Sequence, residues 1–208
     1  MTATVSESTR TRRKVLAVLA GGLVLGVGAA ITLAAWNDSE FATGTFTAGS
    51  FNLQGSTTSA TAAFSDHNVT KGDTAAALSF SAPFSNLTPG DVVYAPFWVR
   101  LDSATTNNAT LVASTGTGTG ANAANISYSV YSIAPAAACD ATATTGTLVA
   151  SGTDLTAFAA GSSVALAKGA TAGTAGTAAQ LCFIATAKSS LAQGSAATGT
   201  WSFTATSN

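Results

Sequence analysis

Short stretches in which apolar and polar residues alternate constrain this chain more than any other feature of its sequence. Four of them run over residues 92–101 (VVYAPFWVRL), 125–132 (NISYSVYS), 180–188 (QLCFIATAK) and 200–206 (TWSFTAT). A period of two places the apolar side chains on one face of a β-strand, and clusters of Gly, Thr, Ser and Asn separate the stretches. We therefore predict an all-β fold, a jelly-roll-like antiparallel β-sandwich with no long helix after the N-terminal region. The expected shared faces are Val93, Ala95, Phe97, Val99 and Leu101; Ile126, Tyr128 and Val130; Leu181, Phe183 and Ala185; and Trp201, Phe203 and Ala205.

Prolines and glycines predict where these strands are interrupted. Pro96 has no N–H for a sheet ladder, so we predict an edge position or a bulge there. Pro89 and Gly90, in the sequence TPGD, suit the two central positions of a turn. Residues 115–120 (TGTGTG) and 168–180 (KGATAGTAGTAAQ) contain few large apolar side chains, and we predict that both are exposed loops.

The first 34 residues combine a basic start with an uncharged apolar run over residues 15–33. As a helix, this run is close to the roughly 30 Å of a bilayer core, so its length suits either a membrane anchor or a signal peptide. Its glycines weaken a helix, and Thr32 and Ala34 are small residues of the kind that a signal peptidase requires. We predict a signal-peptide helix over residues 1–34, cleaved between Ala34 and Ala35, with a retained anchor as the alternative. The preceding basic residues also resemble a twin-arginine export signal, which leaves the export route open: Arg10, Arg12, Arg13 and Lys14.

Few charges remain in residues 35–208, which we expect to form a single β-sandwich domain that begins with an N-terminal arm, residues 35–54. Four basic and eight acidic residues give a net charge of about −4. The bases are too few and too scattered to neutralise a run of phosphates, so we do not expect a nucleic-acid partner. A surface of hydroxyl, amide and small side chains permits dense packing against other chains, because little charge repels a neighbour.

Two cysteines, Cys139 and Cys182, both follow the predicted signal peptide. An even number of cysteines outside the cytosol indicates a structural disulfide. A metal or redox pair is the alternative, but it requires a CxxC spacing or further ligands, and the sequence has neither.

Catalytic patterns are missing from the sequence. His67 is the only histidine, so no HExxH zinc site can form, and no GxSxG motif accompanies it. No GxxxxGK[ST] phosphate-binding loop occurs either. Acidic residues that could meet in space, as a catalytic pair or around calcium, show no motif spacing; they are Asp66, Asp73, Asp91 and Asp102. We predict that the protein is not an enzyme and holds no metal or other cofactor.

Four stretches resemble the TasA/camelysin family of bacterial exported proteins, in its actinobacterial form with an alternate, SipW-type signal peptide. They are TLAAWNDSEFATGTFTAGSFNLQ from Thr32, FSNLTPGD from Phe84, LCFIATAKSSLAQGS from Leu181 and TWSFTATS from Thr200. The resemblance implies cleavage between Ala34 and Ala35 by a dedicated signal peptidase, a jelly-roll sandwich, and assembly into extracellular biofilm fibres. Some relatives have been described as metallopeptidases, an activity that does not carry over because a second histidine is lacking.

The arm itself provides a mechanism for assembly. Phe46 and Ala48 share one phase of a strand, whereas Phe51 and Leu53 share the other, so we predict a strand with a bulge at the change of phase. The arm also carries Trp36 and Phe41, which need a groove if they are to be buried. We expect the arm to add as a strand to an unpaired sheet edge of a neighbouring subunit, once cleavage frees it from the membrane. The alternative is that the arm is simply the first strand of a monomeric sandwich.

These observations favour a secreted structural protein of the cell surface or extracellular matrix that contacts the membrane only through its signal peptide. A secreted binding module for carbohydrate or protein is the alternative function. It requires aromatic side chains to be exposed together in a groove, and the candidates are Trp98, Tyr128 and Tyr131.

Overall fold

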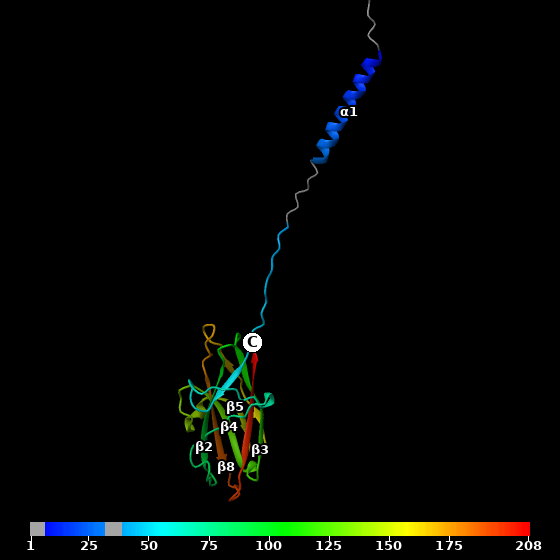
Figure 1. Cartoon of the computed structure of the whole chain (residues 1–208). Coiled ribbons are helices and arrows are strands. Elements are labelled where there is room, and N and C mark those ends of the chain that lie inside the picture. The colour runs from blue at the N-terminus through cyan, green and yellow to red at the C-terminus, as the bar shows by residue number, and fades with distance from the viewer. Residues whose placement is uncertain (1–6, 32–38) are drawn as a thin grey trace, which may run out of the picture. The chain divides into compact units, whose positions relative to one another are not determined.

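The computed structural model describes residues 7–31 and 39–208, of which 7–8 and 24–31 are described as backbone only (Figure 1). The chain forms two compact units, Met1–Phe46 and Thr47–Asn208. The first unit contains a single long helix, α1 (Glu7–Ile31), where the sequence predicts a signal-peptide helix. Among the side chains that the structure describes, no helical stretch is both long and apolar enough to cross a bilayer.

The second unit is an antiparallel sandwich of two sheets, which confirms the predicted all-β class. Its helical elements in the described residues are three short 3-10 turns, η1 (Val69–Lys71), η2 (Ala123–Asn125) and η3 (Ala141–Thr145). The larger sheet has the order β1-β2-β8-β4-β5-β6 and the smaller has the order β7-β3-β9. The strands are β1 (Leu53–Ser56), β2 (Val92–Leu101), β3 (Ala109–Thr119), β4 (Ile126–Ile133), β5 (Thr147–Gly152), β6 (Ala159–Ala160), β7 (Val164–Leu166), β8 (Ala179–Ala187) and β9 (Thr198–Ser207).

The core lies between the two sheets and is built from the predicted alternating faces. Val130, Leu181 and Phe183 of the large sheet are buried in it, and Phe203 packs against it from β9. Trp201, also on β9, contacts Phe183 with their ring centroids 5.0 Å apart. Burial of these apolar side chains is the main stabilising contribution to the sandwich.

The outer face of the large sheet is covered by the loop between β4 and β5. A disulfide joins Cys139 of this loop to the fully buried Cys182 of β8, as predicted. Gln180 lies beside it, and its amide nitrogen donates to the carbonyls of Ala134 and Pro135, both at 3.0 Å. Strand β8 is therefore buried on both faces. Successive residues of β9 alternate between exposed and half-buried, whereas nearly all residues of β8 are buried.

Residues 115–120 are predicted to be an exposed loop, but residues 115–119 form the end of strand β3, so this prediction is wrong for all of them except Gly120. A side chain at Gly116 would lie 2.5 Å from the Tyr128 hydroxyl, and one at Gly118 would lie 2.4 Å from Cβ of Leu155. Glycine is required there because neighbouring groups approach the backbone closely. Residues 168–178, by contrast, form no strand, in agreement with the expected loop.

Pro96 lies in β2, an inner strand of the large sheet between β1 and β8, so it is not on an edge strand; its stretch of β2 is one that β1 does not reach. The N–H and C=O of Tyr94 are directed to Ser81, away from β8, and Pro96, two residues on, faces the same way. Strand β1 reaches β2 only from Trp98 onward. Because no strand pairs with β2 on this side at Pro96, the missing N–H costs the sheet no hydrogen bond.

The predicted strand and bulge at the N-terminal arm are wrong for most of the arm. Residues 39–49 contain no regular strand, and Ser50 forms only an isolated bridge to Thr105. Regular pairing begins at Leu53, which lies opposite Leu101, the last residue of β2. Asn52, just before it, accepts from the N–H of Asp102, which lies beyond the last residue of β2.

Candidate functional site

Strand β9 forms an unusually long free edge of the sandwich. It has ten residues, whereas the other three edge strands have four, two and three residues. Among the described residues, its backbone pairs with no strand other than β3. We call the side of β9 that faces away from β3 the β9 edge. Figure 1 shows β9 in red, ending at the C-terminus.

The β9 edge lacks the features with which proteins usually protect an exposed strand. Its sequence, TGTWSFTATS, has no charged residue and no proline, and its only register shift against β3 is the one between Ala113 and Thr115. Proteins usually shorten such edges, or place lysine, proline or a bulge on them, to prevent pairing with other chains. Alternate N–H and C=O groups along this strand are therefore available to an added strand.

The core is less completely covered beside β9 than elsewhere in the small sheet. Leu111 and Ala109 of β3 are 0% and 1% exposed. The inward side chains of β9, Trp201, Phe203 and Ala205, are only half-buried, although they face the same core. The core is therefore incompletely covered on the side of β9 that faces away from β3.

A cavity of about 820 Å³ lies next to this open side, and we call it the edge cavity. Gly199 and Trp201 of β9 line one part of it, while Val93 of β2 and Ala185 of β8 line another. Phe80 lines it from the segment that precedes β2. Its volume is comparable to that of pockets that hold small ligands, about 300–1,000 Å³, and it is lined largely by apolar side chains.

The described residues of the arm differ in how they are buried. Phe41 and Phe46 are 92% and 96% exposed, and Phe51 is 39% exposed. Leu53, in β1, packs against the core instead. Two features of the predicted site, the cleavage position Ala34–Ala35 and the arm residue Trp36, lie outside the described residues.

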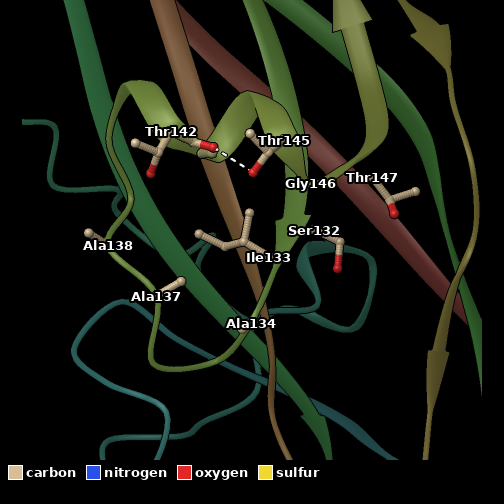
Figure 2. Close-up of a pocket in the computed structure, with 10 residues that line it drawn as sticks. Ser132, Ile133, Ala134, Ala137, Ala138, Thr142, Thr145, Gly146 and Thr147 are labelled. Atoms are coloured by element: carbon tan, nitrogen blue, oxygen red, sulfur yellow. Dashed lines mark hydrogen bonds between the residues drawn. The ribbon is translucent and has the colours of Figure 1, made fainter.

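The second hollow, of about 420 Å³, lies beside the disulfide loop (Figure 2). Ser132 and Thr147 lie on one side of it and Ala137 on the other, and the Thr145 hydroxyl donates to the carbonyl of Thr142 at 2.9 Å. Apart from Ile133, the residues that line it are small, and none carries a titratable side chain. It offers few groups for chemistry or for strong binding.

His67 makes two contacts that the sequence did not suggest. Its Nδ1 faces the Thr74 carbonyl at 3.1 Å, which places the proton on Nδ1 and makes Nε2 the acceptor for the Ser65 hydroxyl, also at 3.1 Å. This pair has the hydrogen bond of a nucleophile and its base. The N–H of Ser65, however, donates to the carbonyl of Gly55 and is not free to stabilise an oxyanion.

The acidic residues considered for catalysis or calcium binding accept hydrogen bonds from nearby protein groups. Asp73, Asp91 and Asp102 each accept a hydrogen bond from a residue three to five positions away. Asp66 accepts from the Asn52 amide at 2.8 Å. Within residues 7–31 and 39–208, no three His, Cys, Asp or Glu side chains lie close enough to hold a metal ion.

Two other carboxylates begin short turns and have perturbed acidity. The hydroxyl and N–H of Thr142 hydrogen-bond to Asp140 and lower its pKa. Thr156 lowers the pKa of Asp154 in the same way, with a smaller contribution from Lys188, whose Nζ lies 3.9 Å away. Both groups lie in loops that connect strands of the large sheet.

The three aromatic residues considered for a binding groove do not lie together on one exposed surface. Tyr128 is 5% exposed within the core, and its hydroxyl donates to the Ala157 carbonyl. Tyr131 packs on the outer face with the disulfide, and the indole N–H of Trp98 donates to Pro135 at 2.9 Å. Burial raises the pKa of Tyr128, in keeping with its place in the core.

The β9 edge and the edge cavity were both missed by the sequence analysis. No local signal marks an edge, because the edge status of β9 depends on the order in which distant strands pair. Comparison with known proteins adds no assignment: no family model matches the chain, and no curated protein matches it. The resemblance to the TasA/camelysin family stays a prediction.

Proposed function

We propose that this protein is an exported structural protein of the cell surface or extracellular matrix, which assembles when the arm of one copy pairs with the β9 edge of the next. The observation that carries this proposal is the ten-residue, uncharged β9 edge beside the apolar edge cavity. Edges of this kind bind extended segments through backbone hydrogen bonds, and pockets beside them select alternate side chains.

The arm has a composition that fits this edge. No charged residue occurs from Phe41 to Leu53, so neither surface repels the other. In an extended conformation Ala42, Gly44, Phe46 and Ala48 lie on one face, which therefore carries one large aromatic side chain among small ones. We expect that face to point into the core, with Phe46 in the edge cavity near Trp201.

Arm and edge are different surfaces, which determines the type of assembly. A contact between two different surfaces propagates head to tail, and it forms filaments unless the rotation between subunits closes a ring. Removal of residues 1–34 by a signal peptidase would release the arm from the membrane and so start assembly. The disulfide supports an oxidising compartment outside the cytosol.

The test compares two arm variants of the secreted chain, after mass spectrometry has shown whether it begins at Ala35. Phe46→Asp places a charge on the expected inward face, and Phe41→Asp places the same charge on the opposite face. We expect filaments in electron micrographs of the unmodified chain and of the Phe41 variant, and at least tenfold less polymer for the Phe46 variant. A secreted chain that stays monomeric at high concentration, or equal assembly of both variants, would contradict the proposal.

A further inference from the structure

The edge cavity combines buried apolar residues with two exposed, uncharged loops. Its buried apolar residues are Val93 and Ala185, which lie opposite each other on β2 and β8, and Leu155. The two loops, residues 84–89 and 191–197, supply most of the remaining lining, and most of their residues are exposed. Among the described residues, no charged side chain lines the cavity. Small-molecule sites usually have this construction, an apolar interior with a few polar groups.

The loop over residues 191–197 is held in place without a ligand. Its anchor is the side-chain amide of Asn122, a residue that is 3% exposed. Nδ2 of this amide donates to the carbonyls of Ala192 and Ser195, both at 2.9 Å, and Oδ1 accepts from the Ala192 N–H at 2.8 Å. This wall of the cavity is therefore preformed, and a ligand does not have to order it.

The opposite wall, which precedes β2, has hydrogen bonds of its own. The carboxylate of Asp91 accepts from the N–H of Thr88 at 2.7 Å and from its hydroxyl at 2.9 Å. The Asn86 N–H donates to the carbonyl of Pro83 at 2.7 Å. Phe84, on the same wall, is 56% exposed. Its ring is thus available to a ligand without a rearrangement of the backbone.

The lining determines the chemical class of the ligand. Three aromatic side chains line the cavity, Phe80, Phe84 and Trp201, and aromatic rings pair favourably with one another in offset or edge-to-face contacts. The side-chain amides of Asn86 and Gln193 also line it and make no hydrogen bond with another described residue. A charged ligand would lose water there without meeting an opposite charge. A ligand with hydroxyl groups on all sides would leave some of them unpaired against the buried apolar residues.

We propose that the edge cavity binds a neutral aromatic small molecule, with its rings against Phe84 and Trp201 and a hydroxyl or amide group at Asn86 or Gln193. This site goes beyond the proposed function, and binding does not require assembly. Phe46 enters the cavity only in the proposed contact between copies, so the cavity of an unassembled chain is open to a ligand.

The first experiment titrates two fluorescent probes into the full secreted chain carrying Phe46→Asp, so that assembly does not interfere. N-phenyl-1-naphthylamine is neutral and aromatic, and 1-anilinonaphthalene-8-sulfonate has the same aromatic body with a negative charge added. We expect saturable one-to-one binding of the neutral probe, at least tenfold tighter than binding of the anionic probe. The proposal is overturned if the neutral probe does not bind, if the anionic probe binds equally well, or if a neutral oligosaccharide displaces the neutral probe.

The second experiment locates the bound probe with a matched pair of variants. Phe84→Ala removes an exposed ring from the cavity, and Phe51→Ala removes a ring that is 39% exposed and does not line it. We expect the first variant to weaken binding of the neutral probe at least fivefold and the second to leave it nearly unchanged. Thermal unfolding checks that both variants fold. Equal affinity of the two folded variants would contradict binding in the edge cavity, whatever the outcome of the assembly experiments.

Discussion

The large sheet ends in strands of four and two residues, whereas the small sheet ends on one side in a strand of ten. In the large sheet, the uncovered part of β2 is protected by Pro96 and by pairing of Tyr94 with Ser81. A disulfide-bound loop also covers its outer face. Nothing comparable protects the β9 edge among the described residues. The disulfide therefore constrains the large sheet, and the proposed function places the contact with other chains on the small one.

The largest expected effect is the difference between substitutions of two phenylalanines that contact each other between the large and the small sheet. Phe183 of β8 and Phe203 of β9 have ring centroids 6.0 Å apart, but Phe183 is 2% exposed and Phe203 is only half-buried. We expect Phe183→Ala to lower the free energy of unfolding by about 3–5 kcal/mol, because it leaves a cavity in a closed core. Phe203→Ala should cost about 1.5 kcal/mol or less, since less apolar area is lost. Urea unfolding of both monomeric variants measures the difference, and equal losses would show that the β9 side is as closed as the β8 side.

The next largest effect concerns the disulfide of the large sheet. Its cysteines are 43 residues apart, a loop length for which chain entropy gives about 4 kcal/mol. Replacing Cys139 and Cys182 together by Ala should therefore lower the free energy of unfolding by about 2–4 kcal/mol. Reduction of the unmodified protein is the matched control. Where the reduced protein stays folded, filament formation should persist, and its loss would tie assembly to the large sheet.

A smaller effect on stability, but a large one on assembly, is expected from lysine at the β9 edge. Thr200 of β9 and Thr117 of β3 lie directly opposite each other, and both are exposed. Thr200→Lys and Thr117→Lys should each change the free energy of unfolding by less than about 0.5 kcal/mol, as for most surface substitutions. Only the first places its charge on the edge strand, so we expect it alone to lower polymer yield at least tenfold. Equal yields from both variants in sedimentation assays would argue against the β9 edge.

The smallest effect is the dependence of stability on pH. Because the folded-state pKa values of Asp140 and Asp154 are lowered, their contribution is present above the ordinary aspartate pKa of 3.8 and is lost as pH falls through the lower folded-state values. Asp140→Asn and Asp154→Asn should each reduce the fall in unfolding midpoint seen on acidification. Strands β3, β7 and β9 carry no titratable side chain, so matching substitutions of their threonines by Ser should leave the acid dependence unchanged. An acid dependence unaltered by both Asn variants would contradict the assignment.

Alternation predicted the strands well wherever one face is buried and the other exposed, as at Trp201 and Phe203. It was less informative for β8, where Cys182 and Ile184 on the second face are buried as well. The loop assigned to residues 115–120 failed for another reason. Glycine has low strand propensity, and the need for it at Gly116 arises from Tyr128, which approaches only in the folded sandwich.

The candidate site could be predicted only in part. The arm is recognisable in the sequence because Phe41 and Phe46 stand among small residues beyond any predicted core. Its partner is not recognisable there, because the β9 edge arises from strand order, and the edge cavity arises from Val93, Ala185 and Trp201, which are distant in sequence. Local pattern therefore indicates the segment that we propose to be donated, whereas the edge that we propose to accept it is visible only in the fold.

The most direct test of the central claim mixes two secreted variants that are each defective in one surface. The Phe46→Asp chain keeps its β9 edge and loses its arm, and the Thr200→Lys chain keeps its arm and loses its edge. The account predicts that neither polymerises alone and that the mixture forms a one-to-one dimer and nothing larger, as measured by light scattering coupled to size-exclusion chromatography. A mixture that remains monomeric, or filaments from either variant alone, would contradict donation of the arm to the β9 edge.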